Sequence, residues 1–134
     1  MRLLLDTHIV IWSLTDDPRL SEKARLLIGD ESNEVLYSTA SSWEVAIKHA
    51  VHPDKMLMGA SEFIDYCTQS GLIQLPIRDR HVVTLETIER SDGAAPHNDP
   101  FDRIMLSQAK ADGLTLITHD TRIAEYDEPC VLYL

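Results

Sequence analysis

The sequence has too few cysteines for a disulfide framework or a cysteine-ligated zinc site. Cys67 and Cys130 are the only two in 134 residues, and they form neither a C-x-x-C pair nor a recurrent spacing. This content argues against small disulfide-stapled scaffolds and is typical of a reducing compartment. We therefore expect a cytoplasmic protein.

Long apolar runs, internal repeats and low-complexity stretches are also absent. The apolar run near Met1 breaks at Asp6, and no segment approaches the roughly 20 apolar residues of a membrane span. We therefore expect neither a signal peptide nor contact with a membrane. A chain of 134 residues with 44% hydrophobic and 25% charged residues is typical of one globular domain. The sequence predicts a single domain over residues 1–134.

Basic residues are scarce. The chain has 12 Lys and Arg residues and 22 Asp and Glu residues, which gives a formal net charge of −10. Such a chain repels phosphate overall, so a nucleic-acid substrate would need a local basic patch, metal ions or both. The same charge favours a basic protein partner.

What the sequence does contain is an alternation of short buried strands and amphipathic helices. Five runs rich in Leu, Ile, Val and Tyr have the continuous apolar character of strands buried on both faces. Strands alternating with helices predict an α/β fold, a three-layer α/β/α sandwich with a five-stranded, mainly parallel sheet. The expected strands are Arg2–Leu5, Val35–Ser38, Leu72–Leu75, Leu114–Thr118 and Cys130–Tyr133.

Helical spacing fills the segments between the strands. Ser21 is an expected N-cap, and Gly71 and Gly113 are expected to end two later helices. The eight residues 91–98 form the one clear loop, too short to separate two domains. Apolar residues mark helical stripes at Ala24, Leu27 and Ile28, at Trp43, Ala46, Ile47 and Ala50, at Phe63, Tyr66 and Cys67, and at Phe101, Ile104, Met105 and Ala109.

Four acids fall where such a sheet places its ligand crevice, beyond the carboxyl ends of the strands at the point where strand order reverses. Asp6 follows the first strand and Asp120 the fourth. Glu44 is expected in the first turn of the helix after the second strand, and Asp102 at the start of the helix that leads into the fourth. If the first and fourth strands are neighbours, Asp6 and Asp120 lie about 5 Å apart.

Carboxylates packed this closely cannot all stay ionised without a cation. Mg²⁺ prefers oxygen ligands and takes one or two carboxylates directly, and paired ions suit phosphodiester chemistry. The pattern therefore predicts a metal site and phosphoryl transfer.

Each acid also has a purely structural interpretation. Asp6 and Asp120 could cap the helices that follow them, and Glu44 could close a capping box with Ser41. Asp99 before Pro100 is a typical N-cap, which leaves Asp102 as a first-turn acid. Caps need not converge on one sheet edge, however, and this favours a shared site.

Other polar and aromatic residues leave alternatives open. The six histidines lack the spacing of a zinc site, although His97 could touch substrate. Thr118 could orient a carboxylate or a water, and Lys48 pairs with Glu44 at ordinary helical spacing. Arg103 could bind phosphate or pair with an acid. Two tryptophans are expected in the core or an interface rather than under nucleobases: Trp12 and Trp43.

Four sequence blocks together resemble the PIN-domain family, specifically its VapC-like type II toxin branch. They occur in family order from residue 4 to residue 120, nearly the whole chain, and the D-P-F-D-R block is the most specific. The blocks are Leu4–His8, Ser41–Glu44 with Ile47 and Lys48, His97–Arg103, and Leu116–Asp120.

The resemblance implies a PIN fold, RNA cleavage that depends on Mg²⁺ or Mn²⁺, and control by a bound antitoxin. It maps the family's acidic catalytic quartet onto Asp6, Glu44, Asp102 and Asp120, with Thr118 in support. Asp6, Asp102 and Asp120 would hold the metal, and Glu44 would orient the attacking water.

Two rival functions stay open at this stage. One is another Mg²⁺-dependent phosphohydrolase, such as a haloacid-dehalogenase-like phosphatase. Those enzymes carry Asp-x-Asp at the end of the first strand, and His8 in place of the second Asp argues against this function. A non-enzymatic acidic docking module for a basic protein would keep the acids but tolerate loss of metal. Trp12 and Leu14 could also serve a homodimer.

Overall fold

A computed structural model describes all residues from 1 to 134. It contains one sheet of five parallel strands in the order β3-β2-β1-β4-β5. The strands are β1 (Arg2–Leu5), β2 (Glu34–Ser38), β3 (Ile73–Leu75), β4 (Thr115–Thr118) and β5 (Val131–Tyr133). These bounds differ from the sequence prediction by at most one residue, so the α/β sandwich is confirmed.

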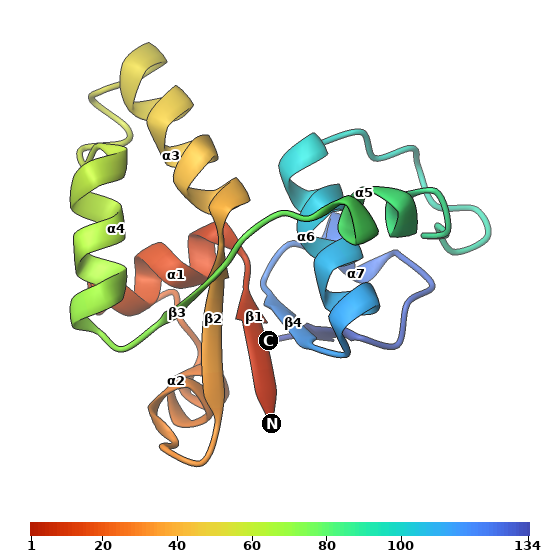
Figure 1. Cartoon of the computed structure of the whole chain (residues 1–134), viewed down its shortest axis with the longest axis horizontal. Coiled ribbons are helices and arrows are strands. Elements are labelled where there is room, and N and C mark those ends of the chain that lie inside the picture. Colours follow the sequence, from red (N-terminus) through yellow and green to blue (C-terminus); the bar gives the residue numbers. More distant parts are fainter.

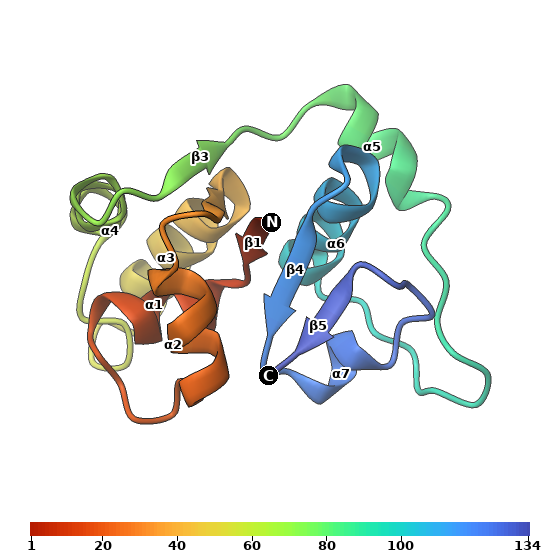
Figure 2. The same ribbon diagram turned by 90° about the horizontal axis from the view of Figure 1, so that it is seen from below.

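Seven helices connect and cover the strands (Figure 1). None has the length and apolar character that a bilayer span requires. Figures 1 and 2 show α1, α2 and α4 on one side of the sheet and α5, α6 and α7 on the other. The helices are α1 (Thr7–Leu14), α2 (Glu22–Gly29), α3 (Thr39–Val51), α4 (Ala60–Gln69), α5 (Asp79–Leu85), α6 (Pro100–Asp112) and α7 (Thr121–Ala124).

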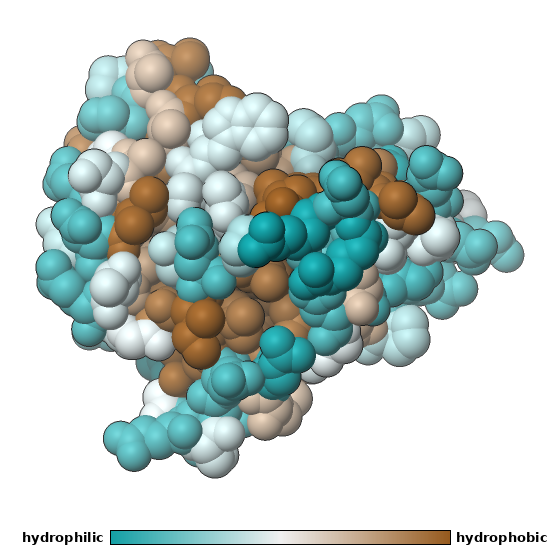
Figure 3. Space-filling model, viewed as in Figure 1, coloured by the Kyte–Doolittle hydropathy of each residue, from teal (hydrophilic) through white to brown (hydrophobic).

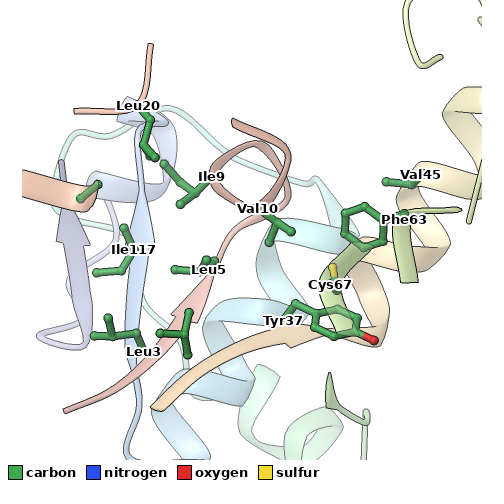
Figure 4. Packing of buried hydrophobic residues seen from close by; sticks show 12 residues of the cluster. Leu3, Leu5, Ile9, Val10, Leu20, Tyr37, Val45, Phe63, Cys67 and Ile117 are labelled. Atoms are coloured by element: carbon green, nitrogen blue, oxygen red, sulfur yellow. The ribbon is translucent and has the colours of Figure 1, made fainter. Parts of the chain in front are cut away.

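Alternation along the central strands creates two hydrophobic cores, one on each face. Leu3 and Leu5 of β1 pack with Tyr37, Phe63 and other residues under α1, α2 and α4 (Figure 4), whereas Leu4 faces α6 and α7. A strand buried on both faces has no polar side, which explains the continuous apolar runs.

Caps fix most helix ends. Ser21 caps α2, and the side chain of Asp99 accepts hydrogen bonds at the start of α6. Gly113 ends α6 with φ +67°, a left-handed conformation that glycine adopts without strain. Ser38 caps α3, so this helix starts at Thr39 and the expected start near Ser41 is wrong.

The chain order places a topological switch point between β1 and β4. From β1 the chain builds outward through β2 and β3, and it then returns to add β4 and β5 on the other side of β1. The first and fourth strands are thus neighbours, which is the condition for Asp6 and Asp120 to lie close together. In sheets of this kind the ligand crevice lies beyond the strand ends at this point.

The surface also carries exposed apolar side chains. In Figure 3, hydrophobic patches lie at the far end of α3 and over α5, where Val51, Val82 and Val83 are exposed. Trp43 is 58% exposed and packs edge-on against Phe101 with ring centroids 5.1 Å apart. It is therefore not a core residue.

Candidate active site

A polar pocket of about 320 Å³ lies at the carboxyl edge of the sheet, beside the switch point. Trp12 is its one hydrophobic lining residue. Lys48 and Arg122 are the basic side chains in its wall, and five carboxylates line it: Asp6, Glu44, Asp99, Asp102 and Asp120. The structure thus brings the four acids singled out in the sequence to one place, together with Asp99.

Asp6 is held from two directions. Its Oδ1 accepts a hydrogen bond from the N–H of Ile9, 3.0 Å away, which caps α1. Its Oδ2 accepts one from the hydroxyl of Thr118 at the end of β4. Asp6 is buried, and this burial raises its pKa, while the hydrogen bonds from Thr118 and Ile9 oppose the rise.

Thr118 connects two of the acids. Besides donating to Asp6, its hydroxyl accepts a 3.0 Å hydrogen bond from the backbone N–H of Asp120. Asp120 caps the short helix α7 and forms an ion pair with Arg122 at 2.8 Å. The hydrogen bond from Arg122 lowers the pKa of Asp120.

Glu44 lies within α3 on the opposite wall of the pocket. Its Oε1 accepts a 2.7 Å hydrogen bond from the hydroxyl of Thr7, and its Oε2 pairs with the ammonium group of Lys48 at 2.6 Å. Because α3 starts at Thr39, Glu44 lies beyond the first turn and does not close a capping box there. Thr7 is a pocket residue that the sequence reasoning missed.

Asp102 occupies the first turn of α6, as predicted, and lies 3.1 Å from Nε2 of His97. Burial raises its pKa to about 8, with further contributions from the charges of Asp99, Asp6, Glu44 and Asp120. The carboxylates are therefore near enough to disfavour one another's ionisation. A bound cation would relieve this repulsion.

His97 is buried and lies behind Asp102 instead of facing the pocket. Its Nδ1 is 3.0 Å from the hydroxyl of Tyr126, and that hydroxyl donates to the backbone carbonyl of His97. Burial lowers the pKa of His97, so its contact with Asp102 is a hydrogen bond of a neutral ring. The expectation that His97 could touch substrate is not supported by this position.

Asp99 and Arg103, close to Asp102 in the sequence, both form hydrogen bonds with the backbone. Asp99 accepts hydrogen bonds from the N–H groups of Phe101 and Asp102 at 2.9 and 3.0 Å, as an N-cap should. Arg103 lies outside the carboxylate pocket, and its guanidinium group contacts the carbonyl of His97 at 3.5 Å. It neither pairs with an acid nor lines the pocket.

No three His, Cys, Asp or Glu side chains are arranged to coordinate one ion. Mg²⁺ does not require such a cage, since it keeps several waters and takes one or two carboxylates directly. The donor set consists of carboxylate oxygens, the ligands that this ion prefers.

The chain belongs to the PIN-domain family, because the family model for the PIN domain matches residues 3–129. This confirms the resemblance found in the sequence. No protein of curated function matches the chain at a significant level.

Solved structures share the fold over nearly the whole chain. VapBC2 from Rickettsia felis bound to a DNA fragment from its promoter has a TM-score of 0.67 at 16% identity, covering 100% of this chain and 98% of that one. A toxin–antitoxin complex from Klebsiella pneumoniae has a TM-score of 0.58 at 19% identity, covering 97% and 95%. VapBC-1 from nontypeable Haemophilus influenzae has a TM-score of 0.59 at 16% identity, covering 92% and 90%.

Proposed function

We propose that the protein is a metal-dependent endoribonuclease that hydrolyses RNA phosphodiester bonds. One observation carries the proposal, namely the convergence of Asp6, Glu44, Asp102 and Asp120 on one pocket at the switch point of a PIN domain. Helix caps alone would not require four acids from four separate segments to meet there.

Asp6, Asp102 and Asp120 are the residues that would hold Mg²⁺, or Mn²⁺ in its place. The raised pKa values of Asp6 and Asp102 support this assignment, because both groups gain from a nearby positive charge. When bound, such an ion offsets the carboxylate charge and that of the phosphodiester, and it lowers the pKa of a water.

The side chains around the pocket then have distinct roles. Glu44 orients the attacking water and takes up its proton, and Thr7 and Lys48 fix the position of its carboxylate. Thr118 holds Asp6 in place at the end of β4. The water oxygen would form a bond to phosphorus while the bond to the 3′ oxygen breaks, and the leaving 3′ oxygen would take its proton from solvent water.

We further propose that the chain is the toxin of a type II toxin–antitoxin pair. The structures similar in fold include complexes of toxins with antitoxins, and the net charge of −10 favours a basic partner. Lys48 and Arg122 already pair with Glu44 and Asp120. A basic side chain from an antitoxin could therefore enter the same pocket and compete with metal.

We also propose that the protein forms a homodimer and acts in the cytoplasm. Leu14, Leu57, Met58 and Tyr66 line an apolar hollow of about 380 Å³ between α1 and α4, and a second copy could cover it. Sedimentation velocity of the chain alone tests this assembly, since replacing Leu57 by Ser would shift a dimer toward monomer.

The alternative function is an acidic docking module that binds a basic protein without catalysis. The ion pairs of Lys48 with Glu44 and of Arg122 with Asp120 favour this function, because they show that cationic side chains fit into the pocket. Such a module would bind its partner equally well with and without divalent cations, and it would leave RNA intact.

The deciding experiment incubates the purified chain with a pool of structured RNAs, with Mg²⁺ or with a chelator, and sequences the new ends. We expect defined cleavage sites that need Mg²⁺ and disappear in Asp6→Asn. Asp79→Asn, which replaces an acid in the first turn of α5 that lies outside the pocket, is the matched control. Uncut RNA, or full cleavage by Asp6→Asn, would contradict the proposal.

A further inference from the structure

A second hollow adjoins the carboxylate pocket and has the opposite electrostatic character. It measures about 300 Å³ and lies between α1 and the segment that links α3 to α4. It shares His8 and Trp12 with the carboxylate pocket, so the two hollows adjoin at these side chains. None of its nine lining residues is acidic, in a chain with 22 acidic residues.

Two cationic side chains line this hollow. The Arg19 guanidinium lies over the Trp12 ring at 5.0 Å from its centroid, and it also pairs with Asp17 at 2.8 Å. Lys55 is exposed and takes part in none of the ten ion pairs of the protein. Its ammonium group is therefore available to a phosphate.

A row of rings runs from the hollow along the wall of the carboxylate pocket, which His8, Trp12 and His119 line. The Trp12 centroid is 6.1 Å from that of His8 and 5.6 Å from that of His119. His119 stacks on Tyr133, with centroids 5.4 Å apart and an angle of 10° between the planes. Tyr133 lies at the end of β5, so the row follows the carboxyl edge of the sheet. Nucleobases stack on such rings with little dependence on sequence.

We propose that this hollow is a nucleotide subsite for single-stranded RNA next to the phosphodiester that is cut. A base would pack against Trp12 and His8, and Lys55 and Arg19 would face the adjoining phosphate. Single strands fit best, because only unpaired bases are free to stack on side chains. The inference rests on the proposed ribonuclease function and names the part of the surface that receives its substrate.

The charges favour RNA over a protein occupant. A basic antitoxin segment would meet the unpaired ammonium group of Lys55, which repels it, whereas an RNA backbone gains from this charge. A second copy would have its best apolar contact at Leu57, which is 79% exposed and also lines the separate apolar hollow between α1 and α4. The shared walls at His8 and Trp12 also suit a polymer that must extend on both sides of the reacting phosphate.

The experiment uses the full chain carrying Trp43→Phe, so that Trp12 is its only tryptophan. A short oligouridylate is titrated in Ca²⁺ in place of Mg²⁺, and a gel verifies that the RNA stays intact. We expect saturable quenching of Trp12 fluorescence. Lys55→Gln should weaken binding about fivefold and reduce the slope of log K against log salt by about 0.7, the effect of one lost phosphate contact on a single strand. Lys23→Gln, on α2 and outside both hollows, should change neither value.

The outcomes separate this subsite from the ribonuclease function. If the protein cuts RNA in Mg²⁺ but Trp12 emission is unchanged and Lys55→Gln equals Lys23→Gln, the subsite is wrong and the nuclease stands. If Lys55→Gln changes only self-association, the hollow is an interface between copies and the subsite is wrong. A third outcome is that RNA quenches Trp12 fluorescence and binds Lys55→Gln more weakly, yet stays uncut in Mg²⁺. That result would support an RNA-binding hollow and overturn the ribonuclease function.

Discussion

The hydroxyl of Thr7 donates a hydrogen bond of 2.7 Å to Oε1 of Glu44 and so joins the start of α1 to the middle of α3. The same hydroxyl lies 2.9 Å from Oγ of Ser41, and Thr7 is buried. One side chain therefore sets the distance between two walls of the carboxylate pocket.

Replacing Thr7 by Val keeps the shape of the side chain but removes this hydrogen bond. We expect the free energy of unfolding to fall by about 1–3 kcal/mol, because buried partners lose their donor, and the rate of RNA cleavage to fall about tenfold. Urea denaturation and a cleavage assay measure the two effects. Thr68→Val, which removes an exposed hydroxyl bonded to a helix carbonyl, should change both quantities little. Equal behaviour of the two variants would contradict a role for Thr7.

His97 positions Asp102 from behind, through the 3.1 Å contact of its Nε2. We expect His97→Leu to weaken Mn²⁺ binding about 10- to 100-fold, the usual effect of losing a residue that orients a metal ligand. His97→Gln, which can still form a hydrogen bond with Asp102, should restore most of the affinity. Titration calorimetry with Mn²⁺ measures this directly. If the Leu and Gln variants bind Mn²⁺ equally well, His97 only fills space.

The raised pKa of Asp102 predicts an unusual dependence of stability on pH. The folded protein keeps a proton on Asp102 up to about pH 8, whereas the unfolded chain releases it near 3.9. The folded state thus binds more protons between these values, so without divalent metal its stability falls as pH rises from about 4 to about 8. Urea denaturation in a chelator across this range tests the slope, which should be smaller in Asp102→Asn. An unchanged slope would contradict the pKa assignment.

Proton and metal compete for the same carboxylate in this account. Below about pH 8, a cation that binds Asp102 must displace its proton, so Mn²⁺ affinity should tighten by up to about tenfold per pH unit. Calorimetry at two pH values below 8 measures this effect. A pH-independent affinity would place the ion elsewhere.

His81 is fully buried and links α5 to the end of α6 that lies opposite Asp102. Its Nδ1 accepts from the N–H of Arg78 at 2.9 Å, so Nε2 carries the proton and donates to Asp112, also at 2.9 Å. The hydrogen bond from Arg80, with help from His81, lowers the pKa of Asp112 to about 2.

His81→Leu should therefore lower the free energy of unfolding by about 2 kcal/mol at neutral pH, because two partly buried groups, the N–H of Arg78 and the carboxylate of Asp112, lose a partner. Mn²⁺ affinity should not change, since this cluster lies away from the carboxylate pocket. His52→Leu, at an exposed position, is the control and should shift stability by less than about 0.5 kcal/mol. An equally large loss of unfolding free energy in His52→Leu, or no loss in His81→Leu, would contradict this view.

The strands and the edge on which the acids gather were predictable because they depend on local patterns. A parallel strand covered on both faces must be apolar throughout, and a parallel sheet brings its carboxyl ends to one edge. The start of α3 was not predictable, because Ser38, Thr39, Ser41 and Ser42 are all good capping residues and only the folded backbone shows that Ser38 caps.

Other features depend on contacts between residues far apart in the sequence, which no local pattern indicates. Helix α5 was missed because Val82 and Val83 are adjacent and exposed, so no apolar stripe marks it, and it is tied to α6 through His81 and Asp112. Thr7 and His97 were underrated because their partners, Glu44 and Tyr126, lie 37 and 29 residues away.

Titration calorimetry with Mn²⁺ tests the central claim that these acids act together as one cation site. The account predicts one or two bound ions per wild-type chain, with binding lost in Asp6→Asn while its thermal stability without metal stays equal or rises, because charge repulsion is relieved. Asp79→Asn should bind Mn²⁺ like the wild type. Undiminished Mn²⁺ binding by Asp6→Asn, or no binding by the wild-type chain, would contradict the account.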